Sequence, residues 1–240
     1  MLAGAMPVYP AHPEHVIQLR DGAVLSIRPL TGDDAPGLTD LFDHMTPEDV
    51  RRRFFVAMRE LPPALLVRLS HPDDAREIAL AALHPDAHGT LCGVARLSAD
   101  AEDRRRAEFA VAVRSDWKQR GLGRALMEEI IRCADERRIE DLYGTILADN
   151  TPMIRLVRQL GFKITADSGD ARLVVAHHPH DAALDHSALT PAARASSARR
   201  TSSTARKRLK SSVEPPAMSQ PSPTSVFWVA GVWSASTALA

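Results

Sequence analysis

The chain has 240 residues, enough for one medium-sized domain or two small ones. Apolar residues make up 45% and charged residues 25%, proportions that are ordinary for a globular protein. The 30 basic and 30 acidic side chains balance, which argues against a basic nucleic-acid-binding protein and against an acidic, solvating chain.

The two cysteines, Cys92 and Cys133, are too few for a disulfide framework. They favour a reducing compartment, and we expect a cytoplasmic protein. Residues 1–16 carry neither the basic start nor the apolar run of a signal peptide. No stretch of about 20 apolar residues predicts a membrane-spanning helix.

The charge is divided unevenly along the chain. Seven basic and three acidic residues follow residue 176, so residues 177–240 carry +4 and the residues before them −4. Residues 187–225 are rich in Ser, Thr, Ala and Pro, a composition that buries too little apolar surface to offset the entropy of ordering. The basic run 206–210 could touch nucleic acid or an acidic partner, although a solvated tail is the simpler interpretation.

The first half of the chain alternates turns with short apolar runs. Asp21-Gly22 between the runs 15–19 and 24–28 predicts a hairpin. A helix capped by acidic residues is expected over 33–45. The segment 46–70 has apolar residues at helical spacing, and a proline pair inside it predicts that it forms two helices.

The second half begins with three strand-like runs and then changes its period. The runs 77–83, 90–97 and 108–113 are joined by polar loops and suggest an antiparallel meander. Residues 122–138 have the spacing of an amphipathic helix. The remaining predicted elements are strand 142–147, helix 151–160, and strands 162–165 and 172–176. This order predicts a mixed α/β sheet with helices packed on it.

The sharpest local signal lies where the strand 108–113 leads into the helix 122–138. Glycines at 121 and 123 let the backbone approach a ligand, and the free N–H groups at a helix start favour an anion. Lys118, Arg120 and Arg124 add positive charge, so a pyrophosphate is the expected ligand. The segment is neither a P-loop nor a dinucleotide fingerprint. An ordinary loop-to-helix turn remains the alternative.

Three motifs in this order resemble those of the GNAT superfamily of acyl-CoA-dependent N-acyltransferases. Residues 118–123, Lys-Gln-Arg-Gly-Leu-Gly, resemble the signature Arg/Gln-x-x-Gly-x-Gly/Ala, with Lys at the first position. Residues 109–113 resemble the strand before it, and Asn150 followed by Leu-Gly-Phe at 160–162 resembles the later helix. The resemblance implies a GNAT-like α/β (α+β) fold, in which helices flank a mixed, mostly antiparallel central sheet.

The resemblance also implies a domain organisation. It covers residues 22–176, which we expect to form the GNAT acetyltransferase domain. Residues 1–21 would then be an N-terminal extension, and residues 177–240 a low-complexity, disordered tail.

A narrower likeness is to the GNAT module of bacterial Pat-like protein lysine acetyltransferases. Residues 26–30, 51–55, 93–96 and 107–111 carry it. In that subgroup the module is often fused to an acyl-CoA-synthetase-like domain, which this chain is too short to hold.

The implied activity is transfer of an acetyl group from acetyl-CoA to a primary amine, with protein lysine as the expected acceptor. A metabolic enzyme such as acetyl-CoA synthetase would be the partner. A small-molecule amine acetyltransferase and a silent acyl-CoA-binding regulatory module remain alternatives. No metal, membrane or nucleic-acid partner is expected.

The resemblance assigns a general base to Glu108, whose pKa burial in an apolar strand would raise. A surface carboxylate paired with the arginines 104–106 is the alternative. Many members place a tyrosine where Val157 stands here, so the general acid stays open, and solvent could protonate the leaving thiolate. The triplet at 51–53 would border the acceptor site and attract an acidic substrate, or else form an exposed face.

The cofactor-binding residues that the resemblance implies are Val111, Ala112, Val113, Lys118, Gln119, Arg120, Gly121, Leu122, Gly123, Arg124 and Asn150. The backbone of 111–113 would bind the pantetheine arm and polarise the thioester carbonyl. Residues 118–124 would hold the pyrophosphate. Asn150 would contact the cofactor near the thioester, a role compatible with capping a helix.

Overall fold

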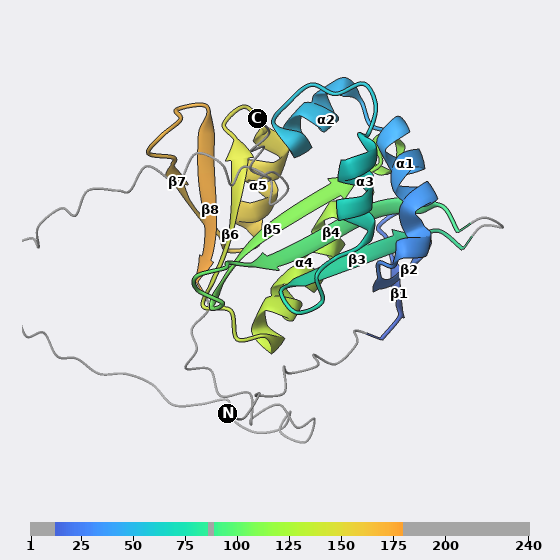
Figure 1. Cartoon of the computed structure of the whole chain (residues 1–240), viewed down its shortest axis with the longest axis horizontal. Helices are drawn as coiled ribbons and strands as arrows, with labels where there is room; N and C mark the ends of the chain where they lie inside the picture. The colour runs from blue at the N-terminus through green and yellow to red at the C-terminus, as the bar shows by residue number, and fades with distance from the viewer. Residues whose placement is uncertain (1–12, 86–88, 180–240) are drawn as a thin grey trace, which may run out of the picture.

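The computed structural model describes residues 13–85 and 89–179 (Figure 1). Within these residues a single 8-stranded sheet has the order β1-β2-β3-β4-β5-β6-β8-β7. The strands are β1 (His15–Gln18), β2 (Val24–Pro29), β3 (Glu77–Leu83), β4 (Leu91–Ala99), β5 (Arg106–Val113), β6 (Asp141–Leu147), β7 (Lys163–Ala166) and β8 (Leu173–Pro179). The helices are α1 (Ala35–Asp43), α2 (Pro47–Phe54), α3 (Pro63–Ser70), α4 (Leu122–Glu136) and α5 (Thr151–Gln159).

One pair of neighbouring strands, β5 and β6, is parallel, and the other pairs are antiparallel. The parallel pairing joins only residues 106–108 to residues 141–143, although β5 continues to Val113 and β6 to Leu147. The two strands therefore separate beyond Glu108, and Figure 1 shows them diverging. The mixed, mostly antiparallel sheet expected from the sequence is confirmed.

The core has two layers, one on each face of the sheet. Leu80 of β3 belongs to a cluster with Leu126 and Ile130 of α4. Its neighbour Ala81 belongs to a second cluster, which includes Leu38 of α1. Because successive strand residues point to opposite faces, β3 is covered on both sides, which explains its nearly continuous apolar sequence.

Local sequence explains where the helices near the site begin and end. The Thr46 side chain accepts a hydrogen bond from the Asp49 amide, and a proline takes the first position of α2. This helix ends well before the proline pair, because Phe55 adopts a left-handed conformation with φ 61°. α4 begins after Gly121, whose φ of 98° favours glycine.

The folded strands extend beyond the predicted domain limits of 22 and 176. β1 lies within the segment expected to be an N-terminal extension, and it pairs with β2 to form the predicted hairpin. At the other end, β8 runs to Pro179 because it pairs along β6 as far as Asp141. The expected tail from residue 180 onward, with its basic run at 206–210, lies outside the described residues, as do residues 1–12. In the described part of the chain, no helix is long and apolar enough to span a bilayer.

Candidate functional site

A cavity of about 630 Å³ is lined by both β5 and β6 beyond the point where they separate. The start of α4, the helix α5 and the ends of α2 and α3 contribute to its wall, as do residues of β3 and β4. The predicted site residues in the wall are Glu108, Val111, Ala112, Val113, Lys118, Gln119, Gly121, Gly123, Arg124 and Asn150. Two predicted residues do not line the cavity. Leu122 is buried in the core, and Arg120 lies over the Trp117 ring, 4.0 Å from its centroid.

Unpaired amides gather at the start of α4. Among the described residues, the amides of residues 119–123 donate no hydrogen bond. Gln119 and Gly121 both have positive φ, 61° and 98°, a left-handed conformation that occurs in turns whose backbone amides bind anions. A Cβ on Gly123 would meet Val113 and Leu156 at ordinary distances of 3.8 and 3.9 Å. The fold itself therefore does not require glycine at 123, whereas the backbone conformation does at 121.

The three basic side chains predicted to surround this turn are paired with carboxylates. Arg124 binds Glu128 at 2.9 Å, a pairing one helical turn along α4. The other two pairs are Lys118 with Asp49 and Arg120 with Asp21. Their charge is therefore largely offset, and for Lys118 and Arg120 the acidic partner comes from a distant segment. The capacity for an anion at this turn rests on the backbone amides and the helix dipole.

Arg20 is a cation that the sequence did not indicate. Its side chain lies 3.5 Å from the position that a Cβ of Gly121 would occupy, and it lines the cavity. Its amide donates to the Arg120 carbonyl at 3.3 Å, which ties the loop after β1 to the turn before α4. No local pattern marks this arginine, because only the fold brings the two segments together.

Glu108 lies at the closed end of the gap between β5 and β6, opposite Tyr143 in the last parallel pair. Burial raises the pKa of this carboxyl to about 7, against the opposing influence of the Arg53 charge. The negative charge of Asp100 raises the pKa further, and a hydrogen bond from the Thr145 backbone lowers it. The raised pKa is the one expected from its place in an apolar strand.

The alternative surface role of Glu108 is not found among the described residues. Arg106 pairs with Asp141 at 3.2 Å, and Arg105 pairs with Asp103 at 3.3 Å. Glu108 itself makes no ion pair in the described part of the chain. Glu108 lines the cavity instead.

Asn150 and Val157, both considered from sequence, and Tyr143 of β6 have clear positions. Asn150 accepts a hydrogen bond from the Met153 amide at 3.3 Å, so it caps α5 while also lining the cavity. Val157 is fully buried in the core. The Tyr143 hydroxyl donates to Asp100 at 2.8 Å, outside the cavity wall, and burial raises its pKa above the ordinary value.

The arginine triplet separates into three environments. Arg51 pairs with Asp149 at 2.6 Å on the surface, and Arg52 pairs with Glu48 at 2.5 Å. Arg53 lines the cavity, close enough to Glu108 for the two charges to influence each other. The sequence predicted that the triplet forms either an exposed face or the border of the acceptor site. Because successive helix residues point in different directions, Arg51 lies on the exposed face and Arg53 lines the cavity.

The wall also holds a charged cluster that the sequence did not indicate. Glu77 of β3 receives two hydrogen bonds from Arg68 of α3, one of them at 2.8 Å. Arg96 of β4 lies 3.7 Å from the same carboxylate. In the described residues no group of three or more His, Cys, Asp or Glu has the arrangement of a metal site.

The amino-acid sequence of the chain is similar to those of known acetyltransferases. The model of the acetyltransferase (GNAT) family matches residues 39–162. The L-amino acid N-acetyltransferase AaaT of Escherichia coli K12 is 37% identical over 76 residues, which are 30% of this chain and 47% of that protein. The ribosomal protein bS18-alanine N-acetyltransferase of the same strain is 39% identical over 54 residues, 22% of this chain and 36% of that protein. The chain thus spans less than half the length of these relatives.

Solved structures share the fold over most of the described residues. The GNAT domain of S. lividans PAT is 28% identical with a TM-score of 0.66, over 72% of this chain and 99% of that one. The PaiA N-acetyltransferase of Thermoplasma acidophilum, solved with coenzyme A, is 15% identical with a TM-score of 0.53, over 65% of this chain and 99% of that one. At that identity the second likeness shows the fold alone.

Proposed function

The chain belongs to the acetyltransferase (GNAT) family, and from that premise we propose that it transfers the acetyl group of acetyl-CoA to the side-chain amine of protein lysines. Acetyl-CoA is the cosubstrate of this family. The support for a lysine acceptor is the resemblance to the GNAT module of Pat-like protein lysine acetyltransferases. The 28% identity with the GNAT domain of S. lividans PAT, over 99% of that domain, agrees with this resemblance.

The residues present fit acetyl-CoA as the cosubstrate. The unpaired amides of residues 119–123 suit a pyrophosphate, and Arg20 lies beside them without an ion pair among the described residues. Among the described residues, the edge of β5 that faces β6 has no strand partner beyond Glu108, so the backbone of 111–113 is available to bind the pantetheine arm. Bound there, acetyl-CoA supplies the activated acetyl group as a thioester.

Glu108 is the general base in this proposal. An acceptor lysine has an ordinary pKa of about 10.4, so its amine must lose a proton before it can attack a carbonyl. A carboxyl with a pKa of about 7 is partly ionised at neutral pH and holds a proton well once it has accepted it. The observation that carries the proposed function is this carboxyl, placed at the closed end of the gap between β5 and β6.

The test is the variant Glu108→Gln, which keeps the size of the side chain but cannot accept the proton. We expect the rate of acetyl transfer to fall by about 100-fold or more, while acetyl-CoA binding, followed by calorimetry, stays unchanged. Glu102→Gln, in the exposed loop before β5, is the matched control and should transfer acetyl at the wild-type rate. Unchanged turnover in Glu108→Gln would remove the base assignment.

A small-molecule amine, an amino acid in particular, is the second candidate acceptor. It is favoured by the 37% identical match to an L-amino acid N-acetyltransferase. Incubation with labelled acetyl-CoA and a cell lysate separates the two candidates. Labelled protein bands support lysine, label confined to small molecules supports the second candidate, and the absence of any label supports a silent binding module.

A further inference from the structure

Several arginines line the end of the cavity formed by α2, α3 and β4, and one of them differs from the others. Arg52, Arg68 and Arg96 each have a carboxylate partner within ion-pair distance. Arg53 makes no hydrogen bond and no ion pair with any described residue. Its guanidinium lies over the neighbouring Phe54 ring, with the guanidinium carbon 5.0 Å from the ring centroid.

Arg53 is half-buried at the cavity, so its guanidinium is only partly hydrated. A guanidinium stays charged at all physiological pH values, and a partly desolvated charge gains from a partner of opposite charge. Burial accordingly lowers the pKa of Arg53. Glu108 is near enough to oppose this effect, but it forms no ion pair with Arg53 and is itself half protonated near pH 7. The Arg53 charge therefore lacks a permanent counter-charge.

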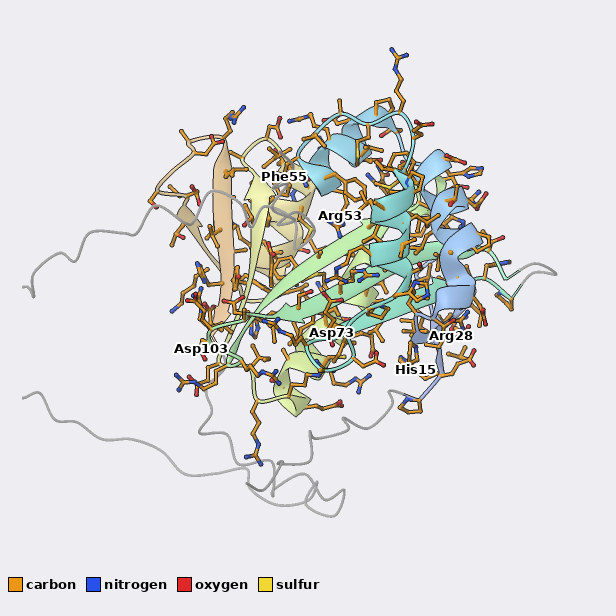
Figure 2. All side chains as sticks on the ribbon, in the orientation of Figure 1. His15, Arg28, Arg53, Phe55, Asp73 and Asp103 are labelled. Carbon is orange, nitrogen blue, oxygen red and sulfur yellow. The ribbon has the colours of Figure 1, made fainter. Side chains whose placement is uncertain are left out.

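Arg53 borders a second, smaller cavity as well. This cavity of about 30 Å³ is lined by apolar residues such as Leu69 and Ala112. Arg53 therefore stands between this apolar cavity and the larger one that Glu108 also lines. Figure 2 shows Arg53 at the end of α2, toward the strands of the sheet.

We propose that Arg53 binds a carboxylate of the acceptor, so that the molecule whose amine meets Glu108 also carries an acidic group. This inference rests on the proposed function. The fork of a guanidinium matches the two oxygens of a carboxylate and forms two parallel hydrogen bonds with it. The carboxylate has two sources, an acidic side chain that flanks the target lysine or the α-carboxylate of an amino acid. The same chemistry recognises both.

The first experiment uses the wild-type protein and changes only the acceptor. Lysine peptides with Glu beside the lysine are compared with the same peptides carrying Gln, and free amino acids are compared with their amides. We expect kcat/KM to be about 10- to 100-fold higher for the carboxylate member of a pair, the range for a hydrogen-bonded charge. Equal values within both series would overturn the inference.

The second experiment assigns the preference to Arg53. Arg53→Gln should give equal kcat/KM for the two members of a pair, and Arg53→Lys should keep part of the preference. Arg51→Gln removes the same charge from the same helix at an exposed position outside the cavity, and should keep the wild-type preference. A preference that persists in Arg53→Gln would contradict the assignment. If thermal melting shows that Arg53→Gln does not fold, the test uses Arg53→Lys. A preference in Arg53→Lys that is weaker than in the wild-type protein supports the assignment, and an unchanged preference contradicts it.

The outcomes separate this inference from the proposed function. Lysine peptides acetylated regardless of flanking charge, together with equal values for free amino acids and their amides, would refute the role of Arg53 and leave lysine as the acceptor. Transfer confined to free amino acids, with their amides poor acceptors, would refute the lysine proposal and support Arg53. Absence of transfer to every acceptor in both series would contradict both.

Discussion

At the residue scale, the behaviour of Glu108 depends on opposing influences from three elements. Burial in β5 raises its pKa, Arg53 from α2 lowers it, and Asp100 from the loop after β4 raises it. A general base must be ionised to accept a proton, so its pKa sets the lower limit of the active pH range. We therefore expect kcat/KM to rise with pH through about 7.

The charge of Asp100 provides a test of this balance at a position outside the cavity wall. Asp100→Asn keeps an oxygen that can accept from the Tyr143 hydroxyl but removes the negative charge that raises the Glu108 pKa. The midpoint of the rising limb of kcat/KM against pH should therefore move to lower pH. Asp103→Asn, in the same loop, is the control. A midpoint that stays in place or moves to higher pH would contradict the role of Asp100.

At the element scale, the start of α4 combines two glycines with different physical roles. Gly121 is needed for its left-handed backbone, whereas Gly123 has room for a methyl group within the protein itself. The turn presents backbone amides to a ligand, so a side chain added at Gly123 would hinder the ligand rather than the packing of the protein. Sequence spacing indicated both glycines but could not separate these roles.

Alanine substitutions separate the two roles experimentally. Gly123→Ala should leave the free energy of unfolding unchanged or raise it by up to about 1 kcal/mol, since alanine favours a helix. The same methyl group on the binding surface should weaken acetyl-CoA binding about tenfold in calorimetry. Gly121→Ala should lose binding and also about 1–2 kcal/mol of stability, because of its positive φ. Wild-type affinity in Gly123→Ala would argue against a ligand at this turn.

At the scale of the whole molecule, Glu77 joins three elements that frame one end of the cavity. Although its burial alone would raise the pKa, the hydrogen bonds from Arg68 and the Arg96 charge hold it below the usual value. A carboxyl whose pKa is lower in the folded protein stabilises the fold above its unfolded pKa of about 4.3. That stabilisation is lost as the pH falls through the folded pKa.

This linkage predicts how stability changes with substitution and pH. Glu77→Gln should lower the free energy of unfolding by about 2–4 kcal/mol at pH 7, because it leaves two arginines without their carboxylate. The loss is moderate because Arg68 is only partly buried and water screens its charge. In urea denaturation the gap between wild type and variant should narrow as the pH falls below about 4. The exposed Glu140→Gln should change stability little at either pH. A gap independent of pH would contradict the linkage.

The sequence by itself determined the order of helices and strands, the mixed sheet, the glycine turn and the candidate base. The helices and the glycine turn depend on patterns within short segments, such as the 3.6-residue period of α4 or the glycines before it. The mixed sheet followed from the order of the elements, and the candidate base from the family resemblance. Even the raised pKa of Glu108 followed from its place in an apolar strand.

Only the tertiary structure decided which charges stay available in the cavity. Lys118 and Arg120 are offset by acidic residues of α2 and of the loop after β1, whereas Arg20 and Arg53 are left without a partner among the described residues. The reason is physical: ion pairs form between side chains that the fold brings together from distant segments. A local pattern shows where a charge stands in the chain, but its partner is set by packing.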